Sequence, residues 1–339
     1  MNGTDIQARS RVQAILGHYW TLAPRIAHGL RPERAPEAGP WTSLVQDARA
    51  GSVRLTGLYR NLGAGTPLLV VVHGLGGTAS SYYACRAARA AEAAGLSCLR
   101  LNLRGAARDG EDFYHAGLVE DLEAALASTE TSDHPDVYVL GYSLGGHLAL
   151  RYGCLRPDPR VRALAAVSAP LDLSACADWI DRPGALIYRR YLLRSLFEMY
   201  DRTASRRPHL LPPDGVRNIR SIRAFDEAVV APRHGFAGAA DYYERASAGP
   251  LLHRLARPAL LLLSPYDPMV PAGSAVPWLI KASPLLTVRW TARGGHVGMP
   301  SGLRIGEGAE PGAENQIVGW FRRQGRKGAQ TAAAYPGHG

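Results

Sequence analysis

The sequence has no long hydrophobic run. Its longest apolar stretches, such as 68–72 and 259–263, have five residues each in a chain of 339. A helix that crosses a bilayer needs about 20. The first twenty residues also contain Asp5, Arg9 and Arg11, which interrupt the apolar core that a secretion signal requires. We therefore expect a cytoplasmic protein without a membrane-spanning helix.

Cysteine is scarce, with four residues: Cys85, Cys98, Cys154 and Cys176. They form no Cys-x-x-Cys pair and have no histidine at zinc-binding spacing, so we expect no metal site. Four cysteines are also too few for a disulfide framework in a chain of this length. Free thiols in a reducing compartment fit this pattern.

Lysine is nearly absent. Of the 39 basic residues only Lys281 and Lys327 are lysines, so arginine carries almost all of the positive charge behind the net +10. Such a charge attracts nucleic acids or anionic membranes in some proteins. The sequence has no zinc finger, no aromatic-rich RNA-binding motif and no basic helical arm. We therefore expect a solvated basic surface and no nucleic-acid partner.

The composition, 46% hydrophobic and 20% charged, is that of a globular protein. The run 68–72 is apolar throughout and bounded by turn residues, as expected for a strand buried on both faces. Strands that alternate with helices predict an α/β fold with a mostly parallel, doubly wound sheet. The expected strands are 53–59, 68–72, 96–103, 137–140, 163–167, 259–263 and 285–290, with helices near 79–94, 118–127, 144–152 and 274–281.

Two stretches depart from this alternation. Residues 1–50 are punctuated by prolines and are expected to form an N-terminal arm with one helix near 12–19. Residues 171–250 have a helical pattern and separate two core strands by far more than an ordinary connection. We interpret them as a cap over the carboxyl edge of the sheet, where ligands bind in such folds. The expected division is an arm at 1–50, a core formed by 51–170 and 251–324, a helical cap insertion at 171–250, and a disordered tail at 325–339.

The strongest local motif is Gly141-Tyr142-Ser143-Leu144-Gly145. It lies where an expected strand ends and an expected helix begins, which is the setting in which Gly-x-Ser-x-Gly forms a nucleophile elbow. The glycines permit a tight turn, and the start of the helix favours negative charge near the serine. Ser143 is therefore the candidate nucleophile.

A serine hydroxyl needs a base and an acid that orients the base, and in this fold they follow in the order Ser, Asp or Glu, His. Asp267 follows the expected strand 259–263, and His296 follows the expected strand 285–290. Both therefore fall at the same edge of the sheet as Ser143. These three residues are the predicted catalytic triad.

Acyl transfer also requires donors for the negative oxygen that forms during the reaction. The segment 73–77, His-Gly-Leu-Gly-Gly, follows the first buried strand and is typical of a loop that supplies one backbone N–H. We predict that the N–H groups of Leu75 and Leu144 form the oxyanion hole. His73 is expected to hold this loop rather than to act as a base.

Several further residues near the expected site favour structural roles. We expect His115 to make a structural hydrogen bond and His147 to pack against its surroundings. Aromatic residues of the cap are expected to provide part of an apolar wall, although core packing accounts for most of them. The residues predicted to contact substrate are His73, Gly74, Tyr142, Tyr188 and Tyr191.

With these motifs in place, the chain resembles the α/β hydrolases and, more narrowly, the YheT-like hydrolases of bacteria. The cap motifs are the specific part of the resemblance, since very many hydrolases share the elbow. One departure is His147, which stands where members of the family commonly have Asn. The matching segments are 73–77, 101–105, 142–146, 167–173, 188–191, 225–228, 231–236, 241–243 and 294–298.

The resemblance implies an α/β-hydrolase fold, hydrolysis of carboxylic esters through an acyl-enzyme on Ser143, and no cofactor. Animal relatives of this family act on lipids, so the implied substrates are short-chain acyl esters, acylglycerols or other lipids. Two alternatives stay open. One is a thioesterase, amidase or carbon–carbon bond hydrolase with the same triad, and the other is a non-catalytic binding protein on the same fold.

The expected cap is rich in arginine and poor in acidic residues. One hypothesis is that this face attracts anionic lipid surfaces, so that the protein associates peripherally with membranes. A solvated helix face is the default interpretation. The sequence gives no oligomeric state. The arginines concerned are Arg182, Arg189, Arg190, Arg194, Arg202, Arg206, Arg207, Arg217, Arg220 and Arg223.

Overall fold

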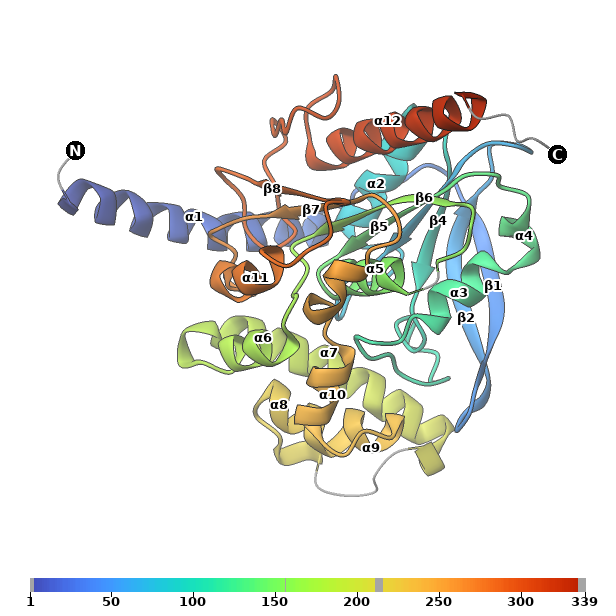
Figure 1. Cartoon of the computed structure of the whole chain (residues 1–339). Helices are drawn as coiled ribbons and strands as arrows, with labels where there is room; N and C mark the ends of the chain where they lie inside the picture. The colour runs from blue at the N-terminus through green and yellow to red at the C-terminus, as the bar shows by residue number, and fades with distance from the viewer. Residues whose placement is uncertain (1–2, 156, 211–215, 335–339) are drawn as a thin grey trace.

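A single mixed sheet forms the centre of the molecule. The computed structural model describes residues 3–155, 157–210 and 216–334, and within them eight strands pair in the order β1-β2-β4-β3-β5-β6-β7-β8 (Figure 1). The pairs β1–β2 and β2–β4 are antiparallel and the others parallel, which confirms the predicted mostly parallel, doubly wound sheet. The strands are β1 Gly39–Asp47, β2 Gly51–Arg60, β3 Leu68–Val72, β4 Ser97–Asn102, β5 Val137–Tyr142, β6 Val161–Val167, β7 Ala259–Leu263 and β8 Leu286–Trp290.

Strand β3 is buried on both faces, as its apolar run predicts. Leu68, Val70 and Val72 belong to one hydrophobic cluster, whereas Leu69 and Val71 belong to another on the opposite face. Successive side chains of a strand point to opposite faces, so a strand in the middle of a covered sheet must be apolar at every position.

The sheet has its switch point at β3. The chain passes from β3 to β4 on one side and then returns to place β5 on the other side of β3. The loops that leave the carboxyl ends of β3 and β5 therefore lie side by side. Ligands of open α/β sheets bind at such a point.

Helices cover both faces of the sheet (Figure 1). Buried residues of α2 and α12 share one cluster with Leu69 and Val71 of β3, and those of α3 and α5 share the opposite cluster with Val70. These helices are α2 Tyr82–Ala93, α3 Glu120–Leu126, α4 Thr129–Ser132, α5 Leu144–Cys154, α11 Ala272–Leu279 and α12 Ala313–Ala334.

The segment between β6 and β7 is helical, as its sequence pattern predicts, and we refer to it as the cap (Figure 1). Its longest helix spans Leu186–Arg206, and the helical segment that begins at Ile222 contains a π-helical turn. The elements are α6 Leu173–Ile180, α7 Leu186–Arg206, α8 Ile222–Phe225, the π turn η4 Asp226–Val230, α9 Ala231–His234 and α10 Ala239–Ala246, with 3₁₀ turns η1 Pro183–Ala185, η2 Pro208–Leu210, η3 Val216–Asn218 and η5 Gly249–Arg254.

A buried ionic network joins the cap to the core. Asp112, in the loop before α3, accepts from Arg233 of α9, with Nε and Oδ1 2.8 Å apart. Arg104 contacts the same carboxyl and also Asp121 and Asp47. All but Asp47 are almost fully buried. Charges removed from water need such partners, so the network fixes the cap relative to the sheet.

The N-terminal residues differ from the expected arm. One helix, α1 Gly3–Leu30, replaces the short helix expected near 12–19, and it continues through Pro24. Strand β1 then pairs with β2 along its whole length. The proline pattern misled because tertiary packing overrides local propensity: a Cβ on Gly298 would collide with the carbonyl oxygen of Trp20, so helix and core meet backbone to backbone.

The C-terminal helix also differs from expectation. Helix α12 continues to Ala334, into the stretch for which we expected a disordered tail, and residues 335–339 lie outside those described. Ile317 and Phe321 bury its first half against the sheet, and helix propagation then adds residues at little cost. No helix within the described residues combines the length and apolar character needed to cross a bilayer.

Candidate active site

Ser143 occupies the sharp turn between β5 and α5. Its backbone has φ 51° and ψ −119°, a conformation that most non-glycine residues avoid. The flanking glycines make this turn possible. A Cβ on Gly141 would collide with the backbone of Gly145, and a Cβ on Gly145 would collide with the carbonyl oxygens of Val72 and His73. The strand–turn–helix setting predicted for the elbow is therefore present.

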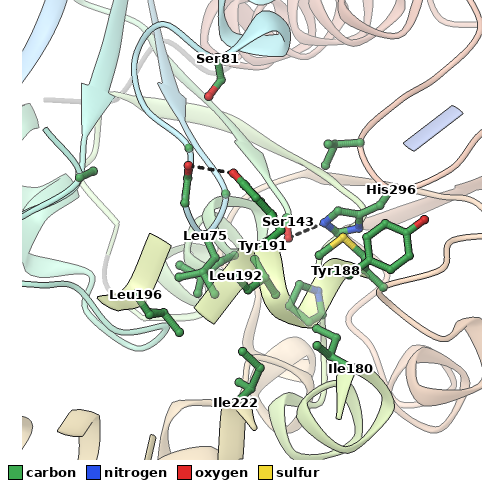
Figure 2. A pocket seen from close by; sticks show the side chains of 18 of the residues that line it. Leu75, Ser81, Ser143, Ile180, Tyr188, Tyr191, Leu192, Leu196, Ile222 and His296 are labelled. Atoms are coloured by element: carbon green, nitrogen blue, oxygen red, sulfur yellow. Dashed lines mark hydrogen bonds between the residues drawn. The ribbon is translucent and has the colours of Figure 1, made fainter. Parts of the chain in front are cut away.

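Three side chains that are distant in sequence meet at this turn, and Figure 2 shows two of them, Ser143 and His296. His296 Nε2 lies 2.8 Å from Ser143 Oγ, and His296 Nδ1 lies 2.9 Å from Asp267 Oδ2. Because a carboxylate accepts at Nδ1, the partners assign the proton to Nδ1 and leave Nε2 free to accept from the serine hydroxyl. The predicted convergence of the three residues is thus present.

The other oxygen of Asp267 is also held. Its Oδ1 accepts from the backbone N–H groups of Met269 and Val270 at 2.8 and 3.0 Å. Asp267 and His296 are 7% and 6% exposed. A carboxylate that accepts backbone hydrogen bonds in a shielded site keeps one orientation, which fixes the imidazole in turn.

Helix α1 supplies a contact that the sequence analysis missed. The backbone N–H of His296 donates to Thr21 Oγ1 at 2.8 Å, and Thr21 Oγ1 donates to the carbonyl of Gly17 at 2.7 Å. Gly295 also packs against Gly17 so closely that a Cβ has no room. No local pattern in the sequence links residue 21 to residue 296. Only the contact between the helix and the loop in the folded protein reveals it.

The loop after β3 is held by tyrosines. The N–H of Gly74 donates to Tyr83 OH at 3.1 Å, and the N–H of Gly76 donates to Tyr114 OH at 3.0 Å. Tyr191 OH donates to the carbonyl of Gly76 at 3.1 Å (Figure 2). In the described part of the chain the N–H of Leu75 has no acceptor.

The second candidate donor is the N–H of Leu144. It is the first residue of α5, and the first N–H groups of a helix have no acceptor within the helix. The approach of the two loops is close, since a Cβ on Gly74 would lie 3.0 Å from Ser143 Cβ. Both predicted oxyanion donors therefore flank Ser143.

His73 stabilises the loop after β3 through both of its ring nitrogens. Its Nδ1 donates to the carbonyl of Gly74 at 2.8 Å, and its Nε2 accepts from the N–H of Leu103 at 3.1 Å. Burial lowers the pKa of His73 to about 4, so the ring is neutral at physiological pH. This geometry matches the loop-holding role that we expected.

A large cavity opens above Ser143. Its volume is about 840 Å³, and it lies between the sheet edge, the cap and α1. We call it the cap cavity. Most of its walls are apolar (Figure 2). The cap contributes Ile180, Tyr188, Leu192, Leu196 and Ile222, and α1 contributes Thr21, Leu22, Arg25 and Ile26.

The predicted substrate contacts divide into two groups. Gly74, Tyr188 and Tyr191 line the cap cavity. His73 and Tyr142 do not, which corrects their assignment as substrate contacts. Tyr142 points to the opposite face of the sheet, where its OH donates to Glu314 at 3.2 Å. In a strand, the residue before the elbow serine must face away from the site.

Two other histidines have clear partners. His115 lines the cap cavity while its Nδ1 accepts from the N–H of Gly117 at 3.1 Å, so it makes the hydrogen bond that we expected. His147 is fully buried, with Nδ1 2.6 Å from the carbonyl of Pro170 and Nε2 2.9 Å from that of Ala246. The residue that departs from the family pattern therefore ties α5 to both ends of the cap.

The described residues include no cluster of three or more His, Cys, Asp or Glu side chains with an arrangement suited to a metal ion. The four cysteines are buried and unpaired. Burial raises the pKa of Cys98, Cys154 and Cys176 to about 12, so these thiols stay protonated.

Residues 69–303 match the alpha/beta hydrolase family. The chain is 34% identical over 249 residues to YheT of Escherichia coli (strain K12), covering 70% of this chain and 72% of YheT. It is 28% identical over 246 residues to the human phospholipase ABHD3, covering 70% of this chain and 59% of that protein. It is 27% identical over 252 residues to the monoacylglycerol lipase of Saccharomyces cerevisiae, covering 68% and 54%. The matched region thus spans less than two thirds of these last two relatives.

Solved structures show the same fold. The structure of 2,6-dihydroxy-pseudo-oxynicotine hydrolase has a TM-score of 0.56 at 17% identity and covers 84% of this chain and 67% of that one. Est1E from Butyrivibrio proteoclasticus has a TM-score of 0.51 at 14% identity and covers 86% and 99%. At such identities the likeness concerns the fold alone. Together with the match over residues 69–303 and the similarity to YheT, it establishes that the chain belongs to the alpha/beta hydrolase family.

Proposed function

We propose that the protein is a serine hydrolase that cleaves carboxylic esters through an acyl-enzyme on Ser143. The observation that carries this proposal is the continuous chain of contacts from Asp267 through His296 to Ser143 Oγ at the base of the cap cavity. A protein that only binds a ligand does not need this chain of contacts, because the chain serves to remove the proton from the serine hydroxyl.

In the first step Ser143 Oγ attacks the ester carbonyl while His296 Nε2 takes the hydroxyl proton. Asp267 keeps the ring oriented and stabilises the imidazolium. The N–H groups of Leu75 and Leu144 receive the negative oxygen of the tetrahedral intermediate. Loss of one such donor lowers rates by about 100- to 1000-fold in comparable sites.

The intermediate collapses when His296 returns the proton to the departing alcohol, which leaves the acyl group on Ser143. Water then attacks the acyl-enzyme with His296 again as base, and the acid is released. No step requires a metal or cofactor as reactant.

The substrate class that we propose is an ester with an apolar acyl part. The walls of the cap cavity support this proposal. Leu192, Leu196 and Ile222 present apolar surface that can contact a hydrocarbon chain, and few of the lining residues are charged. The names of two relatives, a phospholipase and a monoacylglycerol lipase, point to lipid esters. The cytoplasmic location expected from the sequence stays a prediction.

The test is labelling with a fluorophosphonate together with turnover of p-nitrophenyl butyrate. We expect the wild-type protein to label and to turn over ester, and Ser143→Ala to lose both while its thermal unfolding is unchanged. Ser80→Ala is the matched control, because Ser80 also lines the cap cavity but does not contact His296. Labelling or turnover that survives in Ser143→Ala refutes the nucleophile. A folded wild-type protein that never labels favours a binding protein.

A further inference from the structure

The cap cavity contains a carboxyl group that ester hydrolysis does not require. Asp226 lies in the cap at the start of the π turn η4, lines the cavity and is 8% exposed. Val230, at the end of the same turn, also lines the cavity. A π turn inserts an extra residue into a helix and occurs often at functional sites. Here it brings a carboxyl into an apolar wall.

Only one oxygen of this carboxyl has a protein partner. Tyr243 OH donates to Asp226 Oδ2 at 2.6 Å. In the part of the chain that the structure describes, Oδ1 has no hydrogen-bond donor from the protein, and it is not a fully enclosed atom, so it can be reached from the cap cavity. A carboxyl oxygen that the protein leaves without a donor and that faces a cavity can accept a hydrogen bond from a bound molecule or from water.

The charged groups nearby do not supply that donor. Arg223 of α8 is directed to Asp178 at 2.7 Å and to Ser174 Oγ at 2.8 Å. Asp181 accepts from the N–H groups of Ile222 and Arg223 at the start of α8. It is an acid and therefore adds no donor. Burial raises the pKa of Asp226 to about 7, which agrees with a carboxyl that lacks a cation.

The position of Asp226 suits recognition rather than chemistry. In Figure 2, Ser143 lies between Ser81 on one side and Ile222 on the other. Asp226 follows Ile222 by one helical turn and thus lies on the cap side. The stretch between contains Ile180 and Leu192, which fit a hydrocarbon chain.

We propose that Asp226 and Tyr243 form a polar subsite in the cap cavity that accepts a hydrogen bond from a hydroxyl or ammonium group on the substrate, separated by a hydrocarbon spacer from the ester cleaved at Ser143. This inference rests on the proposed function and names its substrate class. The preferred esters carry a hydrogen-bond donor at the end remote from the scissile carbonyl.

The experiment compares esters in matched pairs. One series holds p-nitrophenyl esters of straight-chain acids with a methyl, hydroxyl or ammonium terminus at each chain length. A second series holds butyrate esters of alkanols and of the corresponding diols, so the two series distinguish an acyl-side from an alcohol-side spacer. At the optimal length we expect kcat/KM for the donor-bearing ester to exceed that of its methyl-ended partner by about 10- to 100-fold. The hydroxyl and ammonium arms identify the donor.

The variants test the residues. We expect Asp226→Leu to make kcat/KM equal for the donor-bearing and the methyl-ended ester. Tyr243→Phe reduces the ratio of the two values, because the carboxyl loses the hydrogen bond that orients it. Asp201→Leu is the control: Asp201 is an exposed acid on α7, outside the cavity, and its substitution keeps the wild-type ratio. The subsite is refuted by an equal ratio in wild type and Asp226→Leu, or by a wild-type ratio near one at every length.

Binding separates this outcome from failure of the proposed function. With Ser143→Ala, calorimetry of alkanediols against alkanols measures the subsite without turnover. If ester cleavage fails but diols bind more tightly and lose that preference in the added Asp226→Leu change, the subsite stands alone. If the protein cleaves donor-bearing and methyl-ended esters equally well, only the subsite proposal is refuted and the proposed function stands.

Discussion

At the scale of single residues, the proton positions of the site depend on which partner each side chain has. Asp267 determines that His296 carries its proton on Nδ1, because both ring nitrogens have partners and only Ser143 can donate to Nε2. The surrounding backbone N–H groups hold the carboxylate in place.

The variant Asp267→Asn tests this dependence. The amide preserves size but presents an N–H, so His296 is driven to the tautomer that cannot accept from Ser143. We expect kcat to fall on the order of 1,000- to 10,000-fold, with unchanged thermal unfolding. Steady-state kinetics with p-nitrophenyl butyrate measure it, and a loss under tenfold contradicts the role.

Asp226 makes a prediction about stability that needs no substrate. Burial raises its pKa from an ordinary 3.8 to about 7. At pH values between these two pKa values, Asp226 is protonated in the folded protein and ionised in the unfolded chain. The free energy of unfolding therefore falls as the pH rises through this range, and above it Asp226 causes no further change. Asp226→Asn removes the slope. We expect the melting temperature of the variant, relative to wild type, to rise between pH 5 and pH 8, and a pH-independent difference contradicts it.

At the scale of elements, α1 acts on the site through the loop that carries His296. The prolines of residues 1–50 predict an arm, yet Thr21 accepts a hydrogen bond from the backbone of His296 and the helix lines the cap cavity. Whether a proline-containing segment packs on the core depends on the surface that it meets, which no local pattern encodes.

The variant Thr21→Val tests this contact, since valine has nearly the same shape and lacks the oxygen. It leaves the buried N–H of His296 without an acceptor, a cost of about 1–3 kcal/mol. We expect about a tenfold loss in kcat and in the rate of fluorophosphonate labelling, with recovery in Thr21→Ser. Equal rates in the valine and serine variants contradict a positioning role.

At the scale of the whole molecule, the attachment of the cap rests on charges buried between distant segments. Asp112 in the core contacts Arg104 in the core and Arg233 in the cap. Replacement of either arginine leaves the buried Asp112 carboxylate with one of its two cationic partners.

We therefore expect Arg233→Met to lower the free energy of unfolding by about 3–5 kcal/mol, measured by urea denaturation. Arg245→Met is the control, because Arg245 of α10 pairs with Asp241 at the exposed surface and such pairs contribute about 0–1 kcal/mol. Similar losses in the two variants contradict the network.

The arginines of the cap lead to a prediction about membrane binding. Several of its arginines already have acidic partners, among them Arg194 with Glu198, Arg207 with Glu111 and Arg223 with Asp178. Peripheral membrane association stays a hypothesis, and these pairs reduce the charge available for it. We expect sedimentation with vesicles of phosphatidylserine at about 10 mM salt and none at about 150 mM, because salt screens exposed charges. Binding that persists at the higher salt indicates an apolar contribution to the attachment.

The sequence by itself determined the alternation of strands and helices, the elbow at Ser143, the loop at 73–77 and the positions of Asp267 and His296 after their strands. These features are local: an apolar run, a glycine beside a serine, a strand followed by a turn. Only the tertiary structure decided that Thr21 supports His296, that Tyr142 faces away from the cavity, and that Asp226 enters it. Those facts depend on which surfaces meet across long separations in the chain, and neither periodicity nor propensity carries that information.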